Sequence, residues 1–145
     1  MPILNYTTKI DSYKTIVEIQ KCLAAHGAQK IVIDNDAAGN PVAMTFCVAY
    51  RGCLQGFALP CNYEGVLKAM QRSRKVTRAL CTKEQALRVS WRIIKDWIEA
   101  QMAIIEAGMA EVTEVFLPYA ITKSGKTLFQ HIETDSSLLL AQSNG

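Results

Sequence analysis

Apolar residues recur along this chain with two different periods, and each period predicts a different kind of element. Between residues 12 and 26 they are three or four positions apart (Tyr13, Ile16, Ile19 and Leu23), which is the spacing of one face of an α-helix. Gly27 follows and can adopt the left-handed conformation that ends many helices. The pattern therefore predicts a helix over residues 12–26.

The next part of the chain has the two-residue period of β-strands. Residues 30–34 (KIVID) are rich in β-branched side chains, and residues 42–50 alternate large and small side chains. Arg51 and Gly52 suit a tight hairpin turn, and residues 53–59 then form a third strand before Pro60. This order predicts an antiparallel three-stranded meander with one face toward a core.

Helical spacing returns after the strands. Asn62 can cap a short helix over residues 63–71, and Thr82 with Gln85 has the form of a capping box. From there one apolar stripe predicts a long amphipathic helix over residues 82–118 that Pro118 stops. The stripe consists of Leu87, Trp91, Ile94, Ile98, Met102, Ile105, Met109, Val112 and Phe116.

These elements predict an α+β fold in a single domain over residues 1–145. Its parts are an α-β-β-β-α segment (1–71), a basic connector (72–81), the long helix (82–118) and a tail (119–145). The tail contains a turn (KSGK), a short helical run (TLFQHI) and a polar end.

The expected long helix is larger than its own domain requires. It would measure about 52 Å, against a diameter of about 38 Å for a compact chain of this length. Its apolar arc covers roughly 200° where about 100° suffices for one core. We therefore expect a homo-oligomer, a dimer or higher, whose interface is formed by Ile94, Ile98, Ile105 and Met109; a monomer whose helix bends back at Gly108 is the alternative.

Composition narrows the class of protein. The chain has 145 residues, a net charge of +3 and five cysteines, none of them in CxxC spacing. It has no apolar run long enough for a membrane span or a signal peptide. We expect a cytoplasmic protein without membrane contact, metal site or cofactor.

Positive charge is concentrated in one segment. Residues 72–95 hold half of the 16 basic residues and one acid, whereas residues 96–116 hold five acids and no base. A helix macrodipole favours the reverse order, so the cluster suggests an anion site for a nucleotide or nucleic acid. The alternative is a solvated charged face with ordinary surface pairs. The candidate ligand residues are Arg72, Arg74, Lys75, Arg78, Arg88, Arg92 and Lys95, with Trp91 as a stacking platform.

No other motif in the sequence predicts a functional site. KSGKT at residues 123–127 lacks the earlier glycine and the preceding strand of a P-loop. Asp34 and Asp36 fit a turn better than a Mg²⁺ site. No nucleophile and base stand at a recognisable spacing, so we expect a protein that is not an enzyme.

Several blocks resemble a family of small uncharacterised phage and prophage proteins of Gram-positive bacteria. They are MPILNYTTKI at the start, WRIIKDWIEAQ at 91–101, and VFLPYA at 115–120 followed by GKTL at 125–128. The resemblance covers most of the chain and implies a phage-borne origin and action in the bacterial host cytoplasm. It implies no site residue.

Two classes of function are consistent with these observations. The first is a phage counter-defence protein that sequesters a host factor, such as a host defence protein, or a nucleotide signal without chemistry. Its architecture resembles that of phage proteins that sequester Thoeris signalling nucleotides. The alternative is a DNA-metabolism accessory, such as a single-strand binding or annealing protein; a structural phage protein is a weaker option. The double-stranded-RNA-binding domain has the same helix–strands–helix order, but this chain lacks that domain's GxSKKxAK helix start.

Overall fold

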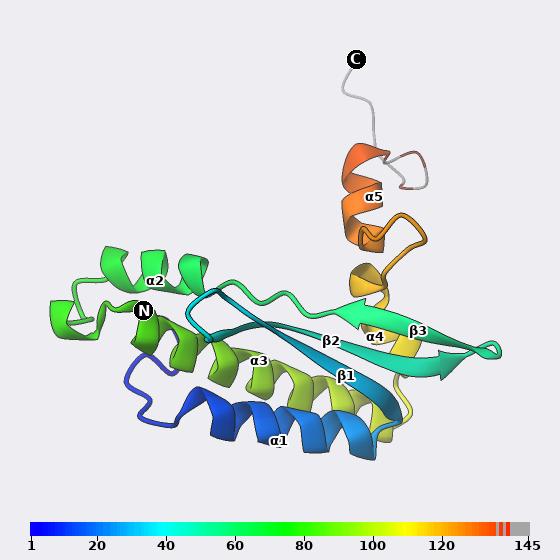
Figure 1. Cartoon of the computed structure of the whole chain (residues 1–145), viewed down its shortest axis with the longest axis horizontal. Coiled ribbons are helices and arrows are strands. Elements are labelled where there is room, and N and C mark those ends of the chain that lie inside the picture. The colour runs from blue at the N-terminus through cyan, green and yellow to red at the C-terminus, as the bar shows by residue number, and fades with distance from the viewer. Residues whose placement is uncertain (136, 138, 140–145) are drawn as a thin grey trace.

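Three antiparallel strands form one sheet in the order in which they occur along the chain (Figure 1). The computed structural model describes residues 1–135, 137 and 139. Its strands are β1 (Ala28–Asn35), β2 (Pro41–Tyr50) and β3 (Cys53–Ala58). Met44 and Phe46 on the central strand are buried on the same face, as the alternation predicted. The predicted meander is thus confirmed.

Two predicted chain reversals use backbone conformations that few residue types adopt readily. Gly27, which follows the first helix, has a φ of +98°. Arg51 and Gly52 in the hairpin have φ values of +50° and +81°. Positive φ at both central residues gives a turn whose twist matches the twist of β2 and β3.

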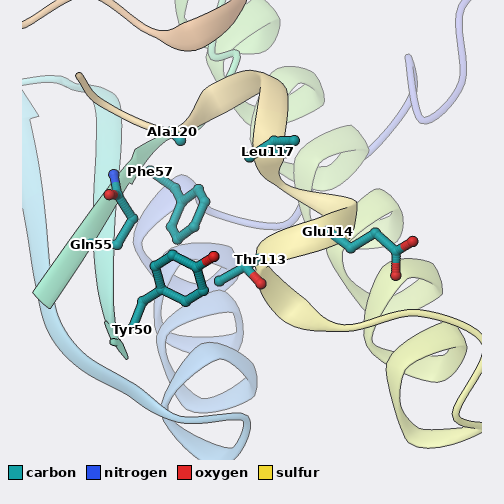
Figure 2. Close-up of a pocket in the computed structure, with 7 residues that line it drawn as sticks. All are labelled: Tyr50, Gln55, Phe57, Thr113, Glu114, Leu117 and Ala120. Atoms are coloured by element: carbon teal, nitrogen blue, oxygen red, sulfur yellow. The ribbon is translucent and has the colours of Figure 1, made fainter. Parts of the chain in front are cut away.

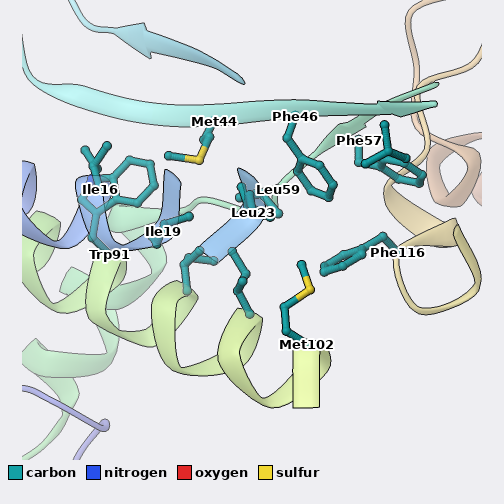
Figure 3. Packing of buried hydrophobic residues seen from close by; sticks show 13 residues of the cluster. Ile16, Ile19, Leu23, Met44, Phe46, Phe57, Leu59, Trp91, Met102 and Phe116 are labelled. Carbon is teal, nitrogen blue, oxygen red and sulfur yellow. The ribbon is translucent and has the colours of Figure 1, made fainter. Parts of the chain in front are cut away.

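Two helices cover one face of the sheet and enclose the main core between them (Figures 1 and 3). They are α1 (Ser12–Ala25) and α3 (Lys83–Glu106). Both present apolar stripes at helical spacing, so each buries one face. The core comprises Ile16, Ile19 and Leu23 of α1; Trp91, Ile94, Ile98 and Met102 of α3; and Met44, Phe46, Val48, Phe57 and Leu59 of the sheet segment, with Phe116.

The predicted helix over residues 82–118 is wrong in its length, because α3 ends at Glu106. Gly108 has a φ of +73°, its N–H donates to the carbonyl of Ile105, and the N–H of Met109 donates to the carbonyl of Ile104. This pair of bonds is the Schellman motif, which terminates a helix. The 24 residues of α3 span about 36 Å, so the helix does not exceed its domain.

After Gly108 the chain turns back and adds short elements to the same core. These are α4 (Val112–Val115), the 3-10 helix η2 (Leu117–Tyr119) and α5 (Leu128–Thr134). Phe116, between the first two, is fully buried, and its ring meets the ring of Phe46 edge-on at 5.2 Å. The apolar period therefore continued past Gly108 because these residues pack into the same core from a separate segment.

The wide apolar arc of α3 has an explanation within the chain. The short helix α2 (Tyr63–Arg72) packs on the side of α3 away from α1 (Figure 1). A second cluster of buried residues lies there, and it consists of Met70, Val76, Ala86 and Val89. Trp97 packs edge-on against Phe116 and Tyr119. Ile104 is 36% exposed. The helix thus contacts its own chain on several sides, which is why its apolar surface exceeds that of a helix covering one core.

The observed order of elements is that of the predicted α+β fold, and the turn and short helix of the tail are present as expected. Most of the polar end, residues 136, 138 and 140–145, lies outside the described residues. Within the described part of the chain, no helix has the length and apolar character needed to span a bilayer.

Candidate anion-binding surface

The basic connector lies between α2 and α3 at one end of the molecule (Figure 1). Asn62 caps α2 by accepting a hydrogen bond from the N–H of Gly65 at 3.0 Å, and Thr82 caps α3 by accepting from the N–H of Gln85 at 3.1 Å. Between them, Val76 is buried in the second cluster and anchors the connector. The 3-10 helix η1 (Arg78–Leu80) completes the path. The middle of the connector and its junction with α3 are therefore held in place, and at its other end the N–H of Ser73 donates to the carbonyl of Met70 at 3.3 Å.

The four basic residues predicted on this connector are exposed and carry uncompensated charge. Among the residues that the structure describes, none of their side chains has a partner within hydrogen-bond or ion-pair distance. They are Arg72, Arg74, Lys75 and Arg78. Exposed guanidinium and ammonium groups without an internal partner are available to an external anion.

The three basic residues predicted on α3 are instead occupied within the molecule. Each pairs with a carboxylate: Arg88 with Glu84, Arg92 with Glu18 and Lys95 with Glu99, at N–O distances of 2.7, 2.9 and 2.9 Å. The side chains of Arg92 and Lys95 are also largely covered. Their geometry is that of ordinary pairs tying α3 to α1 and to itself, which was the alternative interpretation of the cluster.

Trp91 cannot act as the expected stacking platform. It is 1% exposed, and its indole N–H donates to the carbonyl of Pro41 at 3.1 Å. The indole joins α3 to the start of β2 and has no face open to a base.

The residues expected to form an oligomer interface differ in how far they are buried. Ile94 and Ile98 are buried against α1 and the sheet, and Ile105 packs against the same core. Met109, which follows the end of α3, is 75% exposed. Because the chain itself covers most of this stripe, the stripe offers no continuous seam to a second copy.

Sequence reasoning missed Lys68. It lies on α2 one turn before Arg72, and both side chains are exposed. Residues four apart in a helix are neighbours on its surface, but the predicted helix ended at residue 71, and only the extension of α2 to Arg72 brings the two together. Lys68, Arg72, Arg74, Lys75 and Arg78 are called the connector surface below.

A recess of about 370 Å³ adjoins the connector surface. Gln71, Val76, Arg78 and Cys81 line it. Among the described residues that line the recess, Arg78 is the only basic one and none is aromatic. The recess can accept a small anionic group at one side of the surface.

The neighbouring acidic turn does not weaken the connector surface, since its carboxylate is already engaged. Lys83 Nζ lies 2.7 Å from Asp36 Oδ2, and this hydrogen bond, followed by one from the Asn40 N–H, lowers the pKa of Asp36 to about 2. Asp36 also accepts from the N–H of Ala38. The prediction that Asp34 and Asp36 are turn residues is confirmed for Asp36 and wrong for Asp34, which pairs with Ala43 inside the sheet as part of β1.

A separate apolar pocket of about 260 Å³ lies between the sheet and the α4–η2 segment (Figure 2). Phe57, Tyr50 and Leu117 supply its apolar walls. The amide of Gln55 is committed to the carbonyls of Gly56 and Ile121. Among the described residues that line the pocket, Glu114 is the one carboxylate, and none is a histidine, lysine or arginine.

The structure also brings together a hydroxyl–imidazole cluster that the sequence did not suggest. His131 Nε2 lies 2.8 Å from both Thr122 Oγ1 and Ser124 Oγ, and Thr122 Oγ1 donates to the carbonyl of Lys126. Among the described contacts no carboxylate orients the other ring nitrogen, as a nucleophile–base pair requires. The cluster fastens the KSGK turn to α5.

Within the described residues, no group of three or more His, Cys, Asp or Glu side chains is placed to hold a metal ion. No protein-family model, curated protein or solved structure matches this chain.

Proposed function

We propose that this protein binds nucleic acid, without catalysis, through phosphate contacts made by the connector surface. The observation that carries the proposal is the uncompensated charge of that surface. Residues 65–83 hold six bases and no acid, and within the described residues only Lys83 among the six has a carboxylate partner. Such a concentration of free cations is the electrostatic footprint of a polyanion-binding protein.

The chemistry of the surface favours recognition of the phosphate backbone over recognition of bases. Trp91 is inside the core, so the expected base-stacking contact has no structural support. Arginine and lysine contacts to phosphates carry affinity but no direct sequence information. We therefore place the protein nearer to the DNA-metabolism alternative, but as a duplex binder with little sequence preference and not as the single-strand binding or annealing protein that the sequence suggested.

Sequestration of a small nucleotide signal, as in a phage counter-defence role, is a second candidate. The recess beside Arg78 supports it, because its volume is within the range of small-molecule sites. Ligand sites of that kind are usually lined by apolar and aromatic side chains, whereas this one has no aromatic wall. A phage-encoded protein acting in the bacterial cytoplasm suits either role.

Titration of a labelled DNA duplex with wild-type protein at several salt concentrations tests the proposal of nucleic-acid binding. Five phosphate contacts would give a slope of log K against log salt of up to about −4.5. In Arg74→Glu/Lys75→Glu the slope should become shallower by about 2 units, with an affinity loss of tenfold or more at about 0.1 M salt.

The matched control is Lys123→Glu/Lys126→Glu, which makes the same change in net charge on the exposed turn before α5, far from the connector in Figure 1. The control should bind nearly as well as wild type. Equal loss in both variants, or no duplex binding by wild type, would refute the proposal. Saturable binding of ATP that raises the melting temperature and that Arg78→Glu removes would favour the second candidate.

A further inference from the structure

The outer edge of β1 is unpaired in a single copy of the chain. In the part of the chain that the structure describes, β1 is a terminal strand of the sheet and pairs only with β2. No other backbone or side-chain hydrogen bond reaches its main chain from the described residues. Such an edge presents a row of free N–H and C=O groups to any further strand.

The regular part of this edge is short and symmetric in its chemistry. Pairing with β2 is regular from Lys30 to Asp34, and register shifts occur at both ends of this stretch. The five residues read Lys-Ile-Val-Ile-Asp, with Val32 at the centre. An antiparallel copy centred on Val32 would place Lys30 opposite Asp34 of the second strand, twice, and Val32 opposite itself.

From this self-complementarity we propose that two copies of the protein pair through β1 about a two-fold axis at Val32, giving one continuous six-stranded sheet. An isologous contact of this kind closes after two copies. Edge charges often prevent strand association, because they meet a like charge or lose solvent. Here the two charges are opposite in sign and equally distant from the centre, so each attracts its counterpart.

The side chains of this stretch are suited to such a pair on both faces. Ile31 and Ile33 face the core side and are only partly buried, so a second strand would cover them further. On the opposite face Val32 is 39% exposed, and Lys30 and Asp34 are exposed. Neither charge has a partner within the described residues.

The neighbouring helix contributes exposed apolar surface on the same side of the molecule as the turn after β1. Tyr13 and Val17 are 56% and 45% exposed and lie four residues apart on one face of α1. The hydroxyl of Tyr13 donates to the carbonyl of Gly39 in that turn. A dimer through β1 would bring a second copy toward this surface.

The test is sedimentation equilibrium of wild type, Lys30→Asp, Asp34→Lys and the double swap Lys30→Asp/Asp34→Lys. Each single reversal turns two attractive contacts into two repulsive ones and should weaken the dimer by about tenfold or more. The double swap restores opposite charges across the axis and should recover the wild-type dimer. Lys123→Asp, an exposed base outside the proposed seam, is the control and should leave the dimer unchanged.

A wild-type protein that is monomeric at concentrations on the order of 100 μM would overturn the proposal. So would a dimer that the single reversals do not weaken, or a double swap that fails to restore it. Circular dichroism of every variant checks that the exposed substitutions leave the fold intact. Because the connector surface is not altered, failure of the dimer leaves the test of nucleic-acid binding independent.

Discussion

At the scale of single residues, the neighbours decide what a charged side chain can do. Arg74 and Arg92 belong to the same basic cluster in the sequence, yet they differ in the structure. Arg74 is exposed and has no ion-pair partner among the described residues, whereas Arg92 is largely covered and paired with Glu18. The neighbours of His26 likewise decide how its ring behaves. His26 Nδ1 lies 2.8 Å from the carbonyl of Cys22 and Nε2 lies 2.7 Å from Glu106, so both nitrogens are placed to donate when the ring is charged.

This arrangement predicts a pH-dependent contribution of His26 to stability. The hydrogen bond to the Cys22 carbonyl, with a further contribution from Glu106, raises the pKa of His26 above 6.5 against the opposing effect of burial. A raised folded-state pKa means that the stabilisation is complete below about pH 6.5 and is lost as the pH rises through the folded-state value.

We therefore expect the difference in melting temperature between wild type and His26→Gln to be larger near pH 5.5 than near pH 8.5, values about one to two units either side of the ordinary histidine pKa. The chain has two histidines, so NMR can follow His26 directly, and His131→Gln assigns the resonances. Titration of His26 at or below pH 6.5 would contradict the interpretation.

At the scale of elements, the termination of α3 has the largest consequence for the fold. Gly108 adopts a left-handed φ of +73°, and the two hydrogen bonds of the Schellman motif satisfy carbonyls at the end of the helix. This reversal lets Phe116 return to the core beside Trp97. An uninterrupted helix would carry both Val112 and Phe116 away from it.

Substitution of Gly108 tests this account. A Cβ at this position would meet nothing within 4 Å, so Gly108→Ala costs only backbone strain, about 1 kcal/mol of unfolding free energy. Gly108→Asn should cost less, because asparagine tolerates this conformation better. Urea unfolding measures both variants. An alanine variant with unchanged or higher stability, or with more helical signal, would show that the reversal does not depend on glycine.

At the scale of the whole molecule, α3 is the element that joins two packed clusters. Its one side meets α1 and the sheet, and its other side meets α2 and the connector. The same helix separates a basic end, at the connector, from an end rich in acids after residue 95. The C-terminal segment is attached to this frame by the ring of Phe116, which contacts rings from β2, β3 and α3. It is also attached by the ring of Tyr119 against Trp97 and by the hydrogen bond from the Ile121 N–H to the Gly56 carbonyl.

Phe116→Ala should therefore loosen a whole segment. Removal of a fully buried phenylalanine costs about 3–5 kcal/mol of unfolding free energy. Amide exchange should rise most in α4, η2 and α5, with a smaller effect in α1 and β1. Phe129→Ala is the control, because Phe129 is 53% exposed and its loss should cost at most about 0.5 kcal/mol. Similar exchange changes throughout the chain would contradict this picture of the attachment.

The sequence by itself determined the local elements. Helix caps at Asn62 and Thr82, the two-residue alternation around Phe46 and the turn at Arg51–Gly52 are properties of neighbouring residues, and all of them are found in the structure. The lack of local ion pairs for the connector bases was also predictable, since their segment contains no acidic residue.

Tertiary structure alone decided how the surfaces are used. Glu18 is 74 residues from Arg92, so no local pattern could show that the pair forms. Periodicity places Trp91 and Ile98 on an apolar face, but it does not say that α1 and the sheet cover that face. The helical spacing of apolar residues likewise continued across Gly108 and did not reveal the chain reversal there. It continued because residues on both sides of the reversal pack into one core. Pairing and burial depend on contacts between distant segments, and only the folded chain brings those segments together.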